Sequence, residues 1–170
     1  MMKTATVALL LLTLIAPVTF AADEPFAGHY RLDAKASDNV GNAIEDQTKS
    51  MNFITRPIAR GRLKKTNPAY DSIAIAFPAT NISVTLEQRK PIVFPANGTA
   101  VKWTREDGEV FDVSGKVANG VLTQTFVAED GRRTNTYTLS PDGRTMTLNV
   151  KVESPRLPKP VTYKLVYHRV

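Results

Sequence analysis

The sequence predicts one all-β domain: a single antiparallel up-and-down β-barrel of about eight to ten strands with a short helical lid between the first and second strands. Two observations carry this prediction. Five Asn-Gly or Asp-Gly pairs, beginning at residues 97, 107, 119, 130 and 142, recur at steps of 10, 12, 11 and 12 residues. Apolar side chains alternate with polar ones between them. Because such pairs readily adopt the positive φ angles of tight hairpins, the pattern indicates a meander of paired strands.

The first 21 residues read as a secretory signal peptide. The chain begins Met1-Met2-Lys3, continues with an apolar run over 5–16, and then presents small residues up to Ala22. A basic start, a short apolar stretch and small residues are typical of a cleaved leader, with cleavage expected after Ala21. The apolar run is short for a membrane-spanning helix, although a retained anchor is the alternative. Residues 22–170 then form one barrel domain, expected in the periplasm or secreted.

Composition narrows the chemistry. The 170-residue chain contains no cysteine, which excludes both a disulfide framework and a cysteine nucleophile. Its formal net charge of +6 is a weak indication of contact with anionic material. Lack of cysteine in an exported protein favours a Gram-negative periplasm over an animal secretory route.

Alternating apolar residues predict a first strand over 26–33. Ser37 or Asp38 is then expected to cap a helix. Its buried face would consist of Val40, Ile44 and Met51. A second short helix is expected to be capped by Thr55, with Pro57 in its first turn. Ile58 and Leu63 would be its buried side, and Asn67-Pro68 would end it.

From Tyr70 onward the chain alternates as strands do. The apolar runs lie at 73–77, 82–86, 92–94, 101–103, 111–113, 122–126, 137–139, 146–152 and 161–167. The segment 154–160, with three prolines, is expected to be a longer loop between the last two strands. Closing such a meander into a barrel leaves no exposed edge, and about ten strands leave room inside for more than side chains.

Several short motifs resemble the calycin superfamily, in particular its fatty-acid-binding-protein branch and the lipocalin-like exported proteins of bacteria. The opening Phe26-x-Gly28-x-Tyr30-x-Leu32 is similar to the first-strand motif of the superfamily, and Ser37-Asp38-Asn39 to its helix start. The segment 53–59, Phe-Ile-Thr-Arg-Pro-Ile-Ala, is similar to the second-helix motif. Asn119-Gly120 and Asp142-Gly143 fall where the family places its last hairpins.

The resemblance implies a barrel that binds a small apolar or amphipathic ligand, with Gly28, Tyr30 and Arg169 closing one end. Arg169 is expected to lie over Tyr30 as a cation–π contact. The chain departs from the family at the carboxylate clamp. Leu165 stands where the Arg of an Arg-x-Tyr pair is expected, leaving only Tyr167, and the earlier Arg position falls on Thr138. A fatty acid held by the family's own clamp is therefore not expected.

Aromatic and polar side chains alternate on the later strands in a way that suits a ligand pocket. The expected ligand-binding residues are Trp103, Phe126, Asn135, Tyr137, Tyr163 and Tyr167, with Gln124 of ambiguous orientation. The alternative is a filled core in which the polar tips bond to one another, as in an envelope interaction module. No cofactor is expected, and the protein is expected to be a monomer.

A basic cluster surrounds the second predicted helix. It comprises Arg56, Arg60, Arg62, Lys64 and Lys65. One interpretation is a patch that contacts an anionic membrane surface, and the alternative is a solvated helix face. Nucleic acid is not expected as a partner, because no aromatic residues are interleaved with the charges.

Catalytic signals are sparse. The two histidines, His29 and His168, fall on the first and last strands, and Asp33 would be the nearest third ligand for a metal. Neither a catalytic residue nor a metal site is predicted. A barrel-type isomerase or hydrolase that uses an interior tyrosine with Asn135 is the remaining enzymatic alternative.

Overall fold

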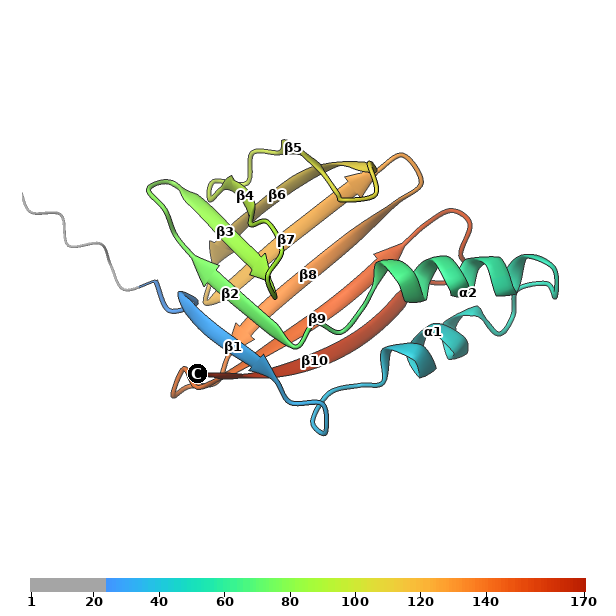
Figure 1. The fold of residues 1–170 in the computed structure, drawn as a ribbon, viewed down its shortest axis with the longest axis horizontal. Helices are drawn as coiled ribbons and strands as arrows, with labels where there is room; N and C mark the ends of the chain where they lie inside the picture. Colours follow the sequence, from blue (N-terminus) through green and yellow to red (C-terminus); the bar gives the residue numbers. More distant parts are fainter. Residues whose placement is uncertain (1–23) are drawn as a thin grey trace, which may run out of the picture.

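Ten antiparallel strands wind almost completely around a central core in the computed structural model, which describes residues 24–170 (Figure 1). The strands are β1 (Gly28–Leu32), β2 (Ser72–Ala76), β3 (Asn81–Leu86), β4 (Ile92–Pro95), β5 (Val101–Thr104), β6 (Val110–Ala118), β7 (Val121–Ala128), β8 (Gly131–Leu139), β9 (Thr145–Glu153) and β10 (Val161–Arg169). Two helices, α1 (Val40–Thr48) and α2 (Thr55–Thr66), lie between β1 and β2. The predicted up-and-down barrel with a helical lid is therefore confirmed.

Strands that follow one another in the chain pair with each other, except β4 and β5, and β1 pairs with both β2 and β10. The sheet has two edges, β4 and β5, which form no ladder with each other. A single bridge between Asn97 and Lys116 crosses this seam, and the Phe94 ring of β4 packs onto Gly115 of β6. The prediction of a hairpin at Asn97-Gly98 is wrong, because the strands on either side of it do not pair.

The other four turn dipeptides lie between paired strands. Asn119 and Gly120 both have positive φ, 51° and 73°, as a two-residue hairpin requires. The turn expected at Asp130-Gly131 is displaced by one residue, since Gly131 already pairs with Ala128. A Cβ on Gly131 would come within 2.5 Å of the Glu153 carbonyl oxygen, so this glycine permits close approach of β9 rather than a turn.

The lid begins with a different cap from the predicted one. Asn39 is the N-cap of α1, and its side chain accepts a hydrogen bond from the Asn42 backbone N–H at 3.0 Å. Ser37 and Asp38 accept instead from backbone N–H groups of β10, at 2.8 and 2.7 Å. Sequence spacing cannot distinguish these roles, because all three side chains are good acceptors. Ser37 and Asp38 thereby fasten the chain to the barrel just before the lid.

The second helix is also held by a residue that the sequence analysis did not single out. The Asn52 side chain accepts from the backbone N–H groups of Ile54 and Thr55, at 3.0 and 2.9 Å, so Thr55 is not the cap. Leu63 is buried as expected, but Ile58 is 71% exposed. Met51 lies beyond the end of α1. These differences arise because the lid spans an opening and has no continuous core beneath it.

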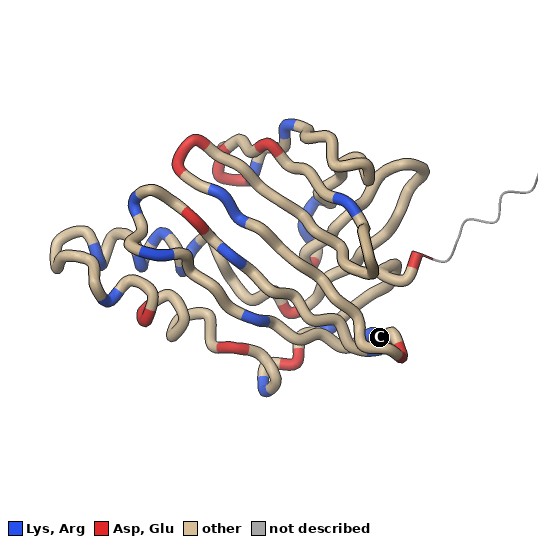
Figure 2. Tube along the Cα trace, turned by 180° about the vertical axis from the view of Figure 1, so that it is seen from behind, with Lys and Arg blue, Asp and Glu red and all other residues tan. Residues whose placement is uncertain are grey.

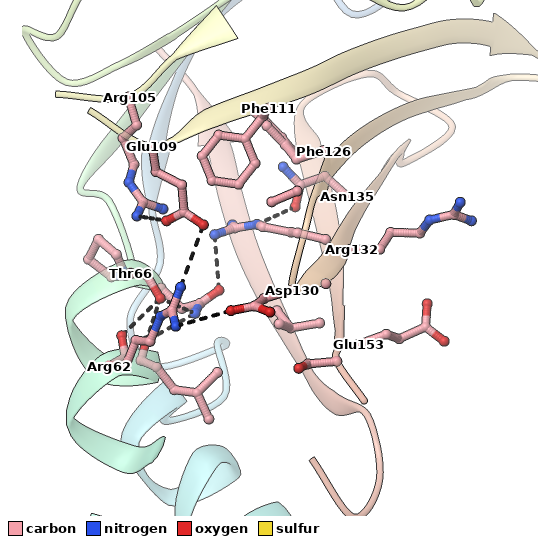
Figure 3. A pocket seen from close by; sticks show the side chains of 18 of the residues that line it. Arg62, Thr66, Arg105, Glu109, Phe111, Phe126, Asp130, Arg132, Asn135 and Glu153 are labelled. Atoms are coloured by element: carbon pink, nitrogen blue, oxygen red, sulfur yellow. Dashed lines mark hydrogen bonds and ion pairs between the residues drawn. The ribbon is translucent and has the colours of Figure 1, made fainter. Parts of the chain in front are cut away.

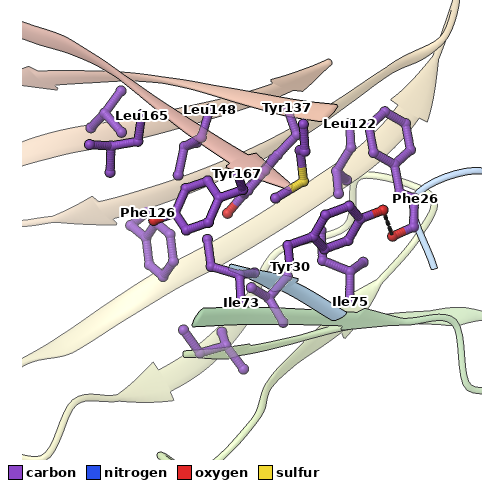
Figure 4. Close-up of a cluster of buried hydrophobic side chains, with 14 of the residues drawn as sticks. Phe26, Tyr30, Ile73, Ile75, Leu122, Phe126, Tyr137, Leu148, Leu165 and Tyr167 are labelled. Carbon is purple, nitrogen blue, oxygen red and sulfur yellow. Dashed lines mark hydrogen bonds between the residues drawn. The ribbon is translucent and has the colours of Figure 1, made fainter. Parts of the chain in front are cut away.

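The barrel has a packed end and an open end. At the base, opposite the lid, Phe26, Tyr30, Ile75 and Leu122 belong to a cluster of buried side chains (Figure 4). The other end, called the mouth here, is bordered by α2, the turns at 87–91, 105–109 and 129–130, and the loop 154–160, which joins the last two strands as predicted. The predicted signal peptide lies outside the described residues. Within residues 24–170, no helix combines the length and apolar character needed to span a bilayer.

Candidate functional site

A cavity of about 510 Å³ extends from the mouth into the barrel. This volume falls within the range of small-molecule sites, about 300–1,000 Å³. Its apolar wall is formed by Ile73, Leu86, Ile92, Leu148, Val152 and Leu165. These residues project inward because they occupy alternate positions on their strands. The interior is therefore not completely filled, and the cavity has the apolar lining that the pocket hypothesis requires.

Three aromatic rings line one side of the cavity. Trp103 and Phe126 were expected there, and both border the cavity. Phe111 of β6 joins them, with its ring centroid 5.8 Å from that of Trp103 and 6.1 Å from that of Phe126. The Phe111 and Phe126 rings meet edge to face at 89°, whereas the Trp103 and Phe111 rings are tilted by 41°. Phe111 was missed as a site residue, although it was expected on an inward-alternating run.

Polar side chains continue the cavity wall along β7 and β8, next to Phe126. Arg133 donates from Nε to Asn135 Oδ1 at 2.9 Å, and Asn135 Nδ2 donates to Gln124 Oε1 at 3.1 Å. The Tyr137 hydroxyl donates to the same Gln124 oxygen at 3.0 Å. Gln124 is 1% exposed and borders the cavity, which settles its orientation as inward. Asn135 and Tyr137 lie in the cavity wall, as expected.

The hydrogen bonds of this row run in one direction. Since a guanidinium can only donate, Arg133 requires the oxygen of Asn135, and the Asn135 nitrogen then requires the oxygen of Gln124. The Gln124 Nε2 group is left at the end of the row, with no hydrogen-bond partner among the described residues. A buried donor without a partner costs roughly 1–3 kcal/mol, so this nitrogen marks a position where the interior is polar and incompletely satisfied.

The interior tyrosines are held in their neutral form. Burial raises the pKa of Tyr137 to about 12 and raises the pKa of Tyr163 and Tyr167, while the positive charge of Arg133 opposes each shift. Tyr167 borders the cavity and donates to the Tyr70 carbonyl oxygen at 3.1 Å. Tyr163 is buried but is not part of the cavity wall, contrary to expectation, and its hydroxyl is directed at Asn67 Oδ1, 3.5 Å away. These hydroxyls are hydrogen-bond donors, not bases, near neutral pH.

Arg133 was not predicted as a site residue. Its side chain borders the cavity and also donates from Nη1 to Asn67 Oδ1 at 3.1 Å. Asn67 is the C-cap of α2, so this bond joins the barrel wall to the lid. The alternation of Arg133, Asn135 and Tyr137 along β8 was the available signal. Thr138, the position of the family's earlier Arg, has the opposite parity and faces outward.

Ion pairs cross the mouth from the lid to the strand turns (Figure 3). Arg62 of α2 lies 3.6 Å from a Glu109 carboxylate oxygen and 3.8 Å from one of Asp130. Arg105 also donates to Glu109, and it holds Asp107 through two hydrogen bonds of 2.9 and 2.8 Å. The carboxylates therefore neutralise Arg62 and Arg105. Exposed pairs of this kind contribute little to stability but position the parts they connect.

The predicted basic patch is largely paired within the lid region. Arg56 donates to the Met51 carbonyl, Arg60 to Thr48 Oγ1 and the Glu45 carbonyl, and Lys64 forms an ion pair with Glu45 at 2.7 Å. Lys65 is exposed and makes no ion pair among residues 24–170. The lid still carries more basic than acidic positions along its length (Figure 2).

At the base, Arg169 closes the barrel as the resemblance implied. Its guanidinium carbon lies 5.0 Å from the centre of the Tyr30 ring, and Nη2 donates to the Tyr30 hydroxyl at 2.7 Å. A Cβ on Gly28 would come within 2.9 Å of the Arg169 Nη1, so the glycine makes room for the arginine. The three residues are structural and lie outside the cavity wall.

The histidines do not form a metal centre in the part of the chain described. His168 Nε2 pairs with Asp33 at 3.0 Å on the exposed face of the barrel. Among residues 24–170, no three His, Cys, Asp or Glu side chains are grouped closely enough to hold a metal ion.

The fold is that of the fatty-acid-binding proteins. No family model and no curated protein sequence matches the chain. Among solved structures, apo lipid binding protein 8 of Caenorhabditis elegans superposes with a TM-score of 0.56 at 11% identity, over 88% of this chain and 98% of that one. Fatty-acid-binding protein 1 of Echinococcus granulosus gives 0.53 at 14% identity, over 86% and 98%. A protein described as the REP1-NXSQ fatty acid transporter gives 0.54 at 17% identity, over 85% and 95%.

Proposed function

We propose that this chain is a monomeric carrier that binds a lipid-like molecule in the barrel cavity and is exported to the periplasm or secreted. The observation that carries the proposal is the cavity of about 510 Å³, with its apolar wall and its short row of polar groups. Ligand sites combine an apolar lining with a few oriented hydrogen-bonding groups in this way. The proteins that share the fold and are described as lipid-binding or fatty-acid-transporting add support from analogy.

The alternatives fit the interior less well. A filled interaction module needs no cavity of this size. An isomerase or hydrolase that uses an interior tyrosine would need a group whose pKa lies near the working pH. Burial moves the pKa of Tyr137 to about 12, which is the wrong direction for a base. We therefore favour binding without a reaction.

The lid offers a surface suited to contact with an anionic membrane. Phe53, Ile54 and Ile58 are 81%, 64% and 71% exposed at the turn between the helices and the start of α2. The positive charges of Arg56 and Lys65 lie on the same helix. Exposed apolar side chains beside basic ones are typical of segments that rest on acidic lipid surfaces. Such contact would bring the mouth close to a source of ligand.

Trp103 provides a direct test of binding, because it is the only tryptophan in the chain and lies in the cavity wall. Titration with oleate and with methyl oleate should change its fluorescence saturably for at least one of the two. Native mass spectrometry of protein purified from its own host should show a bound lipid-like molecule. Protein that is bare in the spectrometer and shows neither a fluorescence change nor a thermal shift with fatty acids, esters or lysophospholipids would refute the carrier function.

A further inference from the structure

Arg133 carries a charge that its surroundings do not neutralise. It is half-buried in the cavity wall, and no carboxylate of residues 24–170 lies within 4.0 Å of its guanidinium. Three other arginines of the rim are paired: Arg62 and Arg105 with Glu109, and Arg156 with Asp130. A partly desolvated cation without a counterion is costly, and proteins usually provide one or leave the position for a bound anion.

Neutral groups fix the orientation of this guanidinium. Asn135 Oδ1 accepts from Nε and Asn67 Oδ1 accepts from Nη1. Both asparagines are themselves 5% exposed, and Asn67 donates in turn to the Leu63 carbonyl at 3.0 Å. Amide oxygens can hold an arginine in place without cancelling its charge. The side chain is therefore preorganised while its full positive charge is retained.

Hydrogen-bonding capacity remains for a ligand. A guanidinium has five N–H groups in a planar fork, and two of them are used by the asparagines. The remaining three suit the two oxygen atoms of a carboxylate. Arg133 is two residues from the mouth end of β8, whereas the apolar residues Ile73, Leu148 and Leu165 line the cavity.

We propose that Arg133 binds the headgroup of the ligand, and that this headgroup is a carboxylate. The ligand then lies with its charged end at the mouth, beneath α2, and its apolar tail against the aliphatic and aromatic walls. The departure from the family's clamp fits this arrangement, because Leu165 and Thr138 leave no guanidinium at those two positions. The inference rests on the proposed function and adds to it the charge and the orientation of the ligand.

The test compares oleate with methyl oleate, which has the same chain but no charge. The wild-type protein should bind oleate more tightly by roughly 10- to 100-fold, the effect expected for hydrogen bonds to a charged group. Arg133→Gln should remove this preference, so that the affinities of the variant for oleate and methyl oleate become similar. Arg132→Gln is the matched control. Arg132 borders the cavity, but its side chain is exposed and points away from Asn135 (Figure 3), so this variant should keep the preference for oleate.

The outcomes separate this inference from the carrier function. If the wild type binds both lipids equally, or Arg133→Gln keeps the preference, the headgroup role is overturned and the carrier function stands. If neither oleate nor methyl oleate binds, this inference is overturned, and the native mass spectrum together with the wider lipid panel decides the carrier function. A second measurement requires no variant: a pH titration of bound oleate, ¹³C-labelled at its carboxyl carbon, followed by NMR. The pKa of the bound carboxyl should lie below that of the same acid in water with wild-type protein, and an unshifted or raised value would contradict the proposal.

Discussion

Arg169 joins the two ends of the described chain at the base of the barrel. Its guanidinium donates to the carbonyl oxygens of Gly143, Ala27 and Pro25 and to the Tyr30 hydroxyl, at 2.9, 2.7, 2.5 and 2.7 Å. Charged donors form stronger hydrogen bonds than neutral ones, and a planar fork can serve several acceptors at once. One side chain thus connects β10, the segment before β1 and the turn between β8 and β9.

Replacement of Arg169 by Met should lower the free energy of unfolding by about 2–3 kcal/mol, because several acceptors lose a charged partner. Arg169→Lys should recover part of this loss, since an ammonium keeps the charge but not the fork. Urea denaturation followed by circular dichroism measures the effect. Lys164→Met, an exposed position on the same strand, is the control and should change stability by less than about 0.5 kcal/mol. A loss for Arg169→Met no larger than that of the control would contradict this role.

For single residues, the sequence predicted the inward orientation of a side chain more reliably than the atoms that the side chain contacts. Strand alternation placed Trp103, Phe126 and Asn135 correctly in the wall of the cavity. It missed Arg133, because the expected turn at Asp130-Gly131 put this residue next to the turn, where an arginine normally points to solvent. In the structure β8 begins at Gly131, so Arg133 lies within the strand and shares the inward face with Asn135 and Tyr137. Burial of Tyr163 behind Asn67 depends on the lid, and no local pattern encodes it.

Hydrogen-bonded carboxylates on several surface turns make the stability of the fold depend on pH. In the β5–β6 hairpin, Arg105 forms two hydrogen bonds with Asp107 and lowers the pKa of that carboxyl to about 2. Asp33, Glu45 and Asp142 also have lowered pKa values, caused mainly by hydrogen bonds to Ala36, Lys64 and Ser140 respectively. Each of these groups stabilises the folded state only while it is ionised.

The Asp107 contribution should be lost in acid. The pKa of Asp107 in the unfolded chain is near its ordinary value of 3.8, and the folded value is about 2. Its stabilisation is therefore complete above about pH 5 and is lost as the pH falls through 2. Melting temperatures should show Asp107→Asn to be less stable than wild type at pH 7, with most of the difference gone at about pH 2. Glu129→Gln, at an exposed turn residue, is the control and should show no such convergence. A difference in melting temperature between Asp107→Asn and wild type that persists in acid would exclude the ionised Asp107 as its source.

The lid shows how an element can be predicted while its packing is not. Both helices were expected from apolar spacing and breakers, and α1 and α2 are present. The buried face of α2 was overestimated: Leu63 is buried, but Ile58 belongs to the exposed tip. Helical periodicity cannot tell whether an apolar stripe meets a core or an opening. The caps were also displaced, since Ser37 and Asp38 bind distant β10, which local spacing does not reveal.

For the whole molecule, the barrel closes by packing where it does not close by hydrogen bonds. The Phe94 ring of β4 crosses the seam and lies on Gly115 of β6, where any larger residue would intervene. A Cβ at Gly115 would also approach the Thr123 carbonyl oxygen to 2.6 Å. The overall fold followed from the turn spacing and alternation, but the position of the seam did not, because the Asn97-Gly98 pair resembles the true hairpins.

Gly115→Ala should therefore destabilise the protein by about 1–3 kcal/mol, the usual cost of overpacking. Gly61→Ala makes the same change in the middle of α2, where the new Cβ would meet no atom within 4 Å. This control should be neutral or more stable by up to about 1 kcal/mol, as alanine favours helix. Thermal unfolding compares the two, and amide hydrogen exchange should be faster in β4 of the Gly115 variant. Equal melting temperatures for the two variants would show that β4 and β6 can move apart at the seam without loss of stability.

Both described ends of the chain, near Glu24 and at Val170, lie at the base, on the side away from the helices (Figure 1). The Val170 N–H donates to the His29 carbonyl at 2.9 Å, so the C-terminus is secured against the first strand. A protein immobilised on a sensor chip through an affinity tag at its C-terminus would consequently present its mouth to the flowing sample. A fluorescent protein fused there would likewise leave ligand access unobstructed.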